Sequence, residues 1–135
     1  MMIERRNPAV GYLKDEVFDA FSFSQVVRVG DAIHLSGITP LRGGLHDLEV
    51  VGSDVRSQLE WVLEVLRRCL EAEGAKLDKL VAVTVYTTAM AELVEAAPVF
   101  NAVFGEHPPA ATWLEVQRLF HPEQKVEVTA IASTA

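Results

Sequence analysis

Apolar and polar positions alternate along the last third of the chain, and this pattern predicts two strands. The segment 108–119 opens with a proline pair, and the segment 126–132 is rich in valine and alanine. Residues 120–125 supply turn-forming residues between the two strands. Because successive side chains of a strand point to opposite faces, we expect Ala111 and Trp113 to share one face.

Glu127 interrupts the apolar pattern of the last predicted strand, where it stands between Val126 and Val128. A carboxylate at such a position needs either solvent on its face or a reason to lie in a cleft. Taken alone, the residue is best interpreted as a solvated surface carboxylate.

The first third of the chain predicts a hairpin after a polar start. Residues 1–21 form an irregular N-terminal segment in this interpretation. The segments 23–29 and 32–36 flank the turn Gly30-Asp31, which is typical of a β-hairpin. A weak extended segment follows at 48–51.

A long helix is predicted after Ser53 or Asp54, because either residue can cap a helix N-terminus. Gly74 marks its expected end. Apolar residues recur at helical spacing between these points, namely Val55, Leu59, Val62, Leu66, Cys69 and Leu70.

A β-branched run at 80–87 predicts a further strand, and a second helix should end near Phe104. Proline is tolerated only in the first turn of a helix, so the helix should begin near Ala97 with Pro98 in that turn. The resulting order of elements indicates an α+β fold with helices on one side of a sheet. The uncovered face of that sheet should be apolar and form an interface.

Length and charge exclude several classes of protein. The chain of 135 residues, half of them hydrophobic, reads as one domain covering 1–135, and its net charge is −7 without a basic block. We therefore expect no nucleic-acid partner. The short apolar runs predict neither a membrane span nor a signal peptide, and the single Cys69 agrees with a reducing, cytoplasmic location.

Motifs for metals and cofactors are missing from the sequence. The four histidines, His34, His46, His107 and His121, show no metal-ligand spacing. No phosphate loop, dinucleotide fingerprint or Ser-His-Asp order appears, so we expect neither a metal nor a cofactor.

The chain nevertheless resembles the Rid family, also called YjgF/YER057c/UK114, from Phe21 to Ala132. The runs that carry the resemblance are Val29-Gly30-Asp31, Ser36-Gly37-Ile38-Thr39-Pro40, Pro109-Ala110 and Val126-Glu127-Val128. The resemblance implies a chorismate-mutase-like domain with a mixed sheet backed by two helices. It also implies a homotrimer with three clefts between neighbouring subunits.

The family's site residues transfer to this chain position by position. Ser36 and Gly37 match positions that meet the polar end of the ligand, and Phe23 stands where active members usually have tyrosine. Glu127 matches the glutamate that is thought to hold and orient the attacking water.

Three further positions depart from the family pattern and make the cleft more apolar. Ala97 stands where many relatives carry asparagine, and Trp113 replaces a smaller residue. Ala111 occupies the position of the arginine that clamps the substrate carboxylate, so the chain resembles a subgroup that lacks it. Strand alternation sends Arg118 to the face opposite Ala111, whereas Arg28 or Arg42 could approach a cleft from another direction.

Two functions follow from the resemblance. The first is hydrolytic deamination of a reactive imine or enamine other than the usual 2-imino acids, with Glu127 as the catalytic residue. The alternative is a non-catalytic trimer that binds a small metabolite or a protein in the same clefts.

Overall fold

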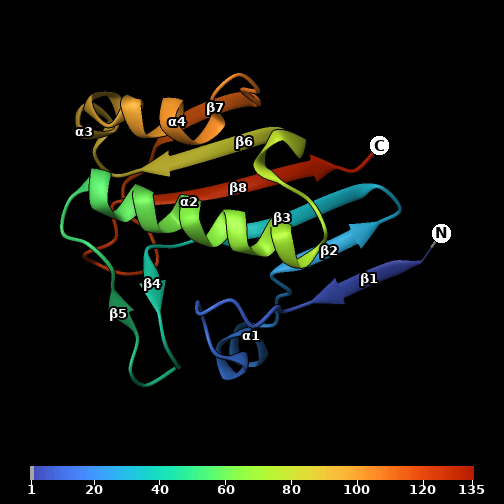
Figure 1. Cartoon of the computed structure of the whole chain (residues 1–135). Coiled ribbons are helices and arrows are strands. Elements are labelled where there is room, and N and C mark those ends of the chain that lie inside the picture. The colour runs from blue at the N-terminus through green and yellow to red at the C-terminus, as the bar shows by residue number, and fades with distance from the viewer. Residues whose placement is uncertain (1) are drawn as a thin grey trace.

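A six-stranded mixed sheet forms the framework of the protein in this computed structural model, which describes residues 2–135 (Figure 1). The strands run in the order β1-β2-β3-β8-β6-β7. Their bounds are Ile3–Arg6 (β1), Val26–Val29 (β2), Ala32–Ile38 (β3), Val126–Ser133 (β8), Leu80–Thr87 (β6) and Ala110–Glu115 (β7). A separate two-stranded sheet joins β4 (Leu41–Arg42) to β5 (Glu49–Val50).

The pairing of the strands confirms the predicted hairpin and the two C-terminal strands. Strands β2 and β3 pair antiparallel around a turn in which Gly30 has a φ of 60°, a conformation that glycine adopts without strain. Strands β7 and β8 do not pair with each other, because β6 lies between them, parallel to β7 and antiparallel to β8. The last two strands of the chain therefore belong to different parts of the sheet.

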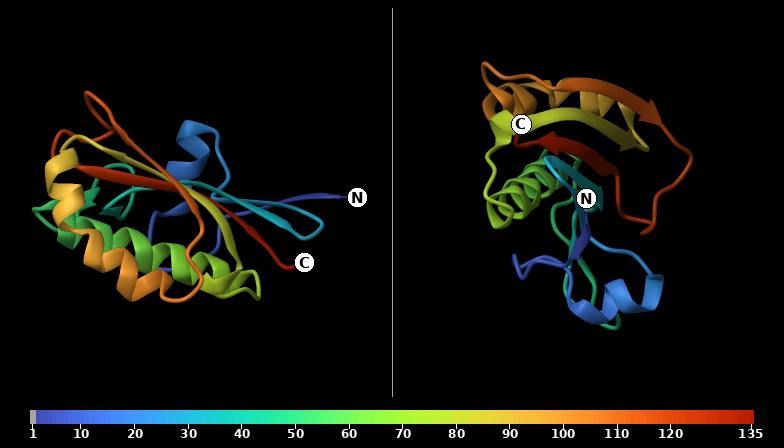
Figure 2. Two further views of the ribbon diagram at one scale, coloured as in Figure 1. Left: turned by 90° about the horizontal axis from the view of Figure 1, so that it is seen from above. Right: turned by 90° about the vertical axis from the view of Figure 1, so that its right-hand side faces the viewer.

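Helix α2 (Val55–Ala72) covers one face of the sheet and confirms the long helix predicted from the sequence (Figure 2). The Asp54 side chain accepts the Ser57 backbone N–H at 2.8 Å, and the Ser57 hydroxyl caps the Asp54 N–H at 3.3 Å. This reciprocal capping box satisfies helix N–H groups that have no partner inside the helix. Between helix and sheet lies the core, whose sheet side includes Val26, Ile33, Leu35, Val83, Val85, Val126, Val128 and Ala130.

Residues 2–135 contain four α-helices, whereas the sequence predicts two. Besides α2 and α4 (Ala97–Phe104), α3 (Met90–Glu95) lies beside them and α1 (Asp15–Phe21) lies on the other side, near the β1–β2 end of the sheet (Figure 2). The expectation of an irregular segment at 1–21 was also wrong, because it contains β1 and α1. Helix α4 begins at Ala97 with Pro98 in its first turn, as predicted.

The uncovered face of the sheet is mixed in polarity and corrects the expectation of an apolar face. Register places Thr84 opposite Thr129, and Tyr86 opposite Glu127, on this side. The exposed His34 and Ile131 lie beside them, on paired strands. Apolar burial alone therefore does not explain what this face contacts.

We expect Leu66→Ala to lower the free energy of unfolding by about 2–5 kcal/mol, because the fully buried leucine would leave a cavity under α2. Urea denaturation at fixed protein concentration measures this loss. The exposed Arg56→Ala variant on the same helix is the control, with a cost within about 0.5 kcal/mol. Equal losses for both variants would show that α2 does not carry the core.

Candidate functional site

A cavity of about 350 Å³ opens between α1, β3, β4 and the end of the connection that leads into β8. Its walls are mostly aromatic and aliphatic, and they belong to Tyr12, Leu13, Val17, Phe21, Phe23, Ser36, Gly37, Thr39, Leu41, Leu48, Phe120 and Glu127. Among the side chains of residues 2–135 that line it, only Glu127 carries a charge. A concave, largely apolar hollow with few polar groups is the usual form of a small-molecule site.

A bulge in β3 brings the Glu127 carboxylate into this cavity. The register between β3 and β8 shifts between Leu35 and Ile38, at Ser36 and Gly37. A Cβ atom on Gly37 would lie 2.1 Å from Glu127 Oε2, a distance that no side chain allows. Any side chain at position 37 would therefore displace the Glu127 carboxylate from where it lies.

Glu127 is partly buried, and the pKa of its carboxyl group is raised by the loss of water around it. The opposing influence is a hydrogen bond, in which Gln124 Nε2 donates to Glu127 Oε1 at 3.1 Å. Glu127 Oε2 has no hydrogen-bond partner within the described residues. One oxygen is thus fixed by the protein and the other is left for a ligand or water.

Gln124 is itself held from several sides and is almost fully buried. Its amide nitrogen also donates to the Val126 carbonyl at 3.1 Å, and its oxygen accepts the His121 N–H at 3.3 Å. These bonds fix the amide so that it presents a donor to Glu127.

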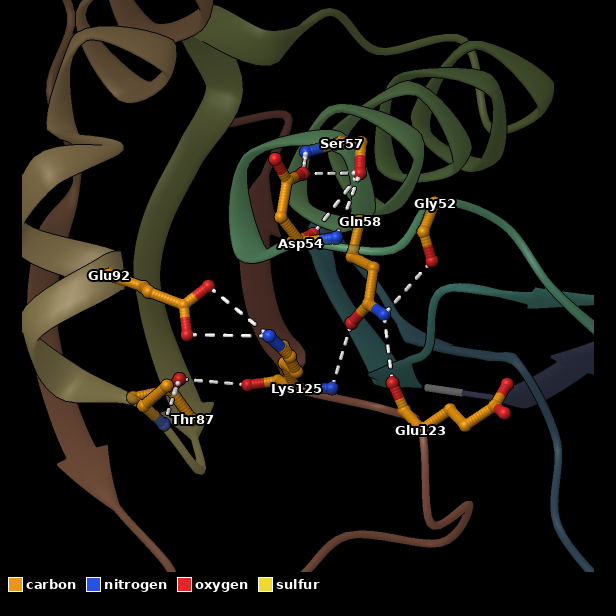
Figure 3. A network of polar contacts seen from close by, with 9 residues as sticks. Gly52, Asp54, Ser57, Gln58, Thr87, Glu92, Glu123 and Lys125 are labelled. Carbon is orange, nitrogen blue, oxygen red and sulfur yellow. Dashed lines mark hydrogen bonds and ion pairs between the residues drawn. The ribbon is translucent and has the colours of Figure 1, made fainter.

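Helix α2 anchors the residues on both sides of Gln124 (Figure 3). The buried Gln58 donates to the Glu123 carbonyl at 2.9 Å and accepts the Lys125 N–H at 2.7 Å. On the other side, the Thr87 hydroxyl donates to the Lys125 carbonyl at 2.8 Å. The packing of the helix on the sheet therefore sets the position of Glu127 through Gln124.

Tyr12 contributes a second polar group at the cavity wall. Its hydroxyl accepts the Thr39 N–H at 2.8 Å and shares a 2.7 Å hydrogen bond with the Thr39 hydroxyl. Burial raises the pKa of Tyr12 to about 12, so the phenol is neutral at physiological pH.

Phe21 and Phe120 form an exposed edge-to-face pair at the cavity, with ring centroids 5.4 Å apart. Phe23 lies deeper against Phe18, at a centroid distance of 4.9 Å. Aromatic rings thus line both the deeper wall and the exposed side of the cavity.

The comparison with known proteins identifies the family. Residues 14–134 match the family model described as Endoribonuclease L-PSP. A RutC family protein of Pyrococcus abyssi is 34% identical over 110 residues, which are 82% of this chain and 84% of the relative. The chain belongs to the Rid (YjgF/YER057c/UK114) family.

Other similar proteins include one with a named activity and several with solved structures. The 2-iminobutanoate/2-iminopropanoate deaminase of Escherichia coli is 30% identical over 113 residues, 82% of this chain and 85% of that protein. A solved protein of Thermotoga maritima is 31% identical, with a TM-score of 0.83 over 98% of both chains. The E. coli YjgF gene product has 30% identity and a TM-score of 0.73, covering 84% of this chain and 88% of its own. The fold is thus the chorismate-mutase-like α+β fold of the Rid family.

The structure brings four of the seven predicted Rid site residues into the cavity, namely Phe23, Ser36, Gly37 and Glu127. Ala111 and Trp113 line a different hollow between β7 and α4, where the Trp113 ring lies 5.2 Å from that of Phe100. Ala97 lies at the start of α4 and lines neither hollow. Within one chain, Trp113 is therefore a packing residue and does not face Glu127.

Within the described chain, the cavity is lined by none of Arg28, Arg42 and Arg118. Arg28 donates to the Glu73 carbonyl at 2.9 Å and to the Thr134 hydroxyl at 3.0 Å. Arg42 pairs with Glu49 at 2.7 Å, across the β4–β5 sheet. Arg118 is exposed in the connection after β7 and does not line the cavity.

Sequence reasoning missed Tyr12, Gln124 and Phe120. Tyr12 lies in the segment that looked irregular, and the other two lie in residues interpreted only as a turn. The sequence offered one indication of Gln124, namely its position three residues before Glu127, an isolated glutamate in an apolar strand.

Within residues 2–135, no three histidine, cysteine, aspartate or glutamate side chains are grouped so that they could hold a metal ion. None of the helices in the described chain is both long and apolar enough to span a bilayer.

We expect Glu127→Gln to be more stable than the wild type at pH 7. Because burial raises the pKa of the folded carboxyl group, the folded state binds this proton more tightly than the unfolded chain does. The folded state then loses stability as pH rises from the unfolded pKa, about 4.3, through the folded one. At neutral pH the midpoint of urea denaturation should be higher for Glu127→Gln than for the wild type. The two midpoints should coincide below about pH 4.

Glu123→Gln is the matched control, since it removes the same charge from an exposed position close in sequence. A Glu127→Gln protein that is less stable than the wild type at pH 7 would contradict the burial of the charged form.

Proposed function

We propose that this Rid-family protein binds a small metabolite in the cavity and hydrolyses a reactive imine or enamine that is not a 2-imino acid. The observation that carries the proposal is the Glu127 carboxylate over Gly37, partly buried and with Oε2 open to the cavity. Family membership supports the reaction class, because one relative is a 2-iminobutanoate/2-iminopropanoate deaminase.

In the proposed reaction Glu127 positions a water molecule beside the C=N carbon. The water oxygen forms a bond to carbon while its proton passes to the Glu127 carboxylate and onward to nitrogen. In the resulting carbinolamine, the hydroxyl proton passes to nitrogen, the C–N bond breaks to release ammonia, and the oxygen becomes the carbonyl group of the product. General acid–base help of this kind contributes roughly 10²–10⁴-fold, which suits a substrate that is already electrophilic.

The substrate differs from 2-imino acids because the anchor for a carboxylate is missing. A guanidinium forms two parallel charge-assisted hydrogen bonds with a carboxylate, whereas the Ala111 methyl group forms none. Within the described chain, the cavity lining adds no cation and one carboxylate. A substrate carboxylate would therefore meet a like charge.

We further propose a homotrimer in which the hollow of Ala111 and Trp113 faces the cavity of a neighbouring subunit. Two observations support it. The family assembles its sites between subunits, according to the resemblance, and β7 is an edge strand whose outer side has no partner in the described sheet. Ala97, at the start of α4, would then approach the cleft from the neighbour.

We expect 2-iminopropanoate to be hydrolysed at least about tenfold more slowly than by an arginine-containing relative, because the charge-assisted pair is absent. An amino-acid oxidase makes the imine in place, and semicarbazide trapping reports how fast it disappears. Turnover within tenfold of the relative would mean that another group binds the carboxylate.

Glu127→Gln should lower kcat/KM by about 10²-fold or more for an imine without a carboxylate, since the amide accepts no proton. An amine oxidase supplies such imines, and the same trapping assay measures turnover. Glu123→Gln is the control and should retain wild-type turnover. An unchanged kcat/KM for Glu127→Gln would remove Glu127 from the mechanism, and the hydrolase function would lose its only matched catalytic residue.

Light scattering should give the mass of three chains at micromolar concentration. A single monodisperse monomer would contradict the shared cleft.

A further inference from the structure

Two polar side chains at the cavity, Ser36 and Glu127, offer acceptors to a ligand. The Ser36 hydroxyl donates its proton to the Ser24 carbonyl at 2.6 Å, so it can only accept from a ligand. Glu127 Oε2, an oxygen of a carboxylate, is likewise an acceptor. A ligand that satisfies both groups must therefore bring hydrogen-bond donors.

The charge of Glu127 is held in place without being neutralised. Its partner Gln124 is a neutral amide, whereas the buried Glu73 is paired with Arg6 at 2.6 Å and Arg28 at 3.6 Å. A carboxylate fixed by an amide keeps its full charge for a ligand. Removed from part of its water, it favours a positive partner more strongly than a surface carboxylate does.

The aromatic rings of the cavity favour the same kind of ligand. Phe21, Phe23 and Phe120 all line it, and the faces of aromatic rings attract cations. Aliphatic side chains complete the wall, so the remainder of a ligand should be apolar.

We propose that the cavity selects small ligands with an ammonium or iminium nitrogen on an apolar body, and rejects carboxylates. This inference rests on the proposed function only in taking the cavity as the ligand site. The nitrogen donates to Glu127 Oε2 and the Ser36 hydroxyl, and the apolar body lies against the phenylalanines. An iminium ion is also the form of an imine that water attacks most readily, so the same recognition would serve hydrolysis.

Three probes of nearly equal size separate charge from apolar contact, namely benzylamine, benzyl alcohol and benzoate. Isothermal titration of the purified protein should give the order benzylamine, benzyl alcohol, benzoate, from tightest to weakest. A hydrogen bond to a charged group corresponds to about 10- to 100-fold in affinity, which is the expected gap between the amine and the alcohol.

Glu127→Gln should remove that gap while leaving the affinity for benzyl alcohol within about twofold, because only the charge is lost. Glu123→Gln, with the same charge change outside the cavity, should keep the gap. Phe120→Leu should lower benzylamine affinity by about two- to fivefold, and Phe120→Tyr should restore it.

Benzoate binding as tightly as benzylamine, or an amine preference that survives in Glu127→Gln, would overturn the proposal. If Arg118→Ala then abolished benzoate binding, an arginine from a neighbouring subunit would be the anchor and the cavity would be a carboxylate site. Selective amine binding without imine turnover would leave this inference intact and contradict only the hydrolase function.

Discussion

The close approach of the Glu127 carboxylate to Gly37 is the constraint on which the site depends. A side chain at position 37 would occupy the space of Glu127 Oε2, so the bulged glycine allows the carboxylate to lie where it does. On β8 the residues on either side of Glu127 point into the core, since Val126 and Val128 are fully buried. The core therefore fixes the strand, and the strand directs the carboxylate to the other face, into the cavity.

A chain of uncharged contacts then holds the carboxylate. Helix α2 positions Glu123 and Lys125 through Gln58 (Figure 3). The residue between them is Gln124, and its amide donates to Glu127. Two arginines neutralise the charge of Glu73 near the end of α2, whereas the partner of Glu127 is a neutral amide. Because Glu127 is partly desolvated, its charge lowers the stability of the folded state. That charge remains available to a ligand.

The sequence was sufficient for elements whose signal is local. The apolar spacing and cap of α2, the Gly30 turn and the position of Pro98 each predicted their elements correctly, because helix and turn formation depend on neighbouring residues. Short elements such as β1 and α3 were missed, since their periodicity is too brief to stand out. The insertion of β6 between β7 and β8 depends on long-range pairing, which alternation along a strand does not encode.

The residues of the site were also predicted only in part from the sequence. The family resemblance named Phe23, Ser36, Gly37 and Glu127, which line one cavity, but it gave no account of the contacts that hold Glu127. The contacts of Gln124 and Tyr12 form only in the folded chain, where the connection before β8 and the N-terminal segment lie against the sheet. Trp113 packs on Phe100 in its own chain, so its place in a cleft depends on a neighbouring subunit.

The most direct test is the pKa of Glu127, measured by carbon-13 NMR of its carboxyl group in the ligand-free protein. A carboxylate held in a cavity by a neutral amide should titrate above the ordinary glutamate value of about 4.3. A pKa at or below that value would mean that water or a positive group reaches Glu127, and it would contradict the desolvated, cation-selective site.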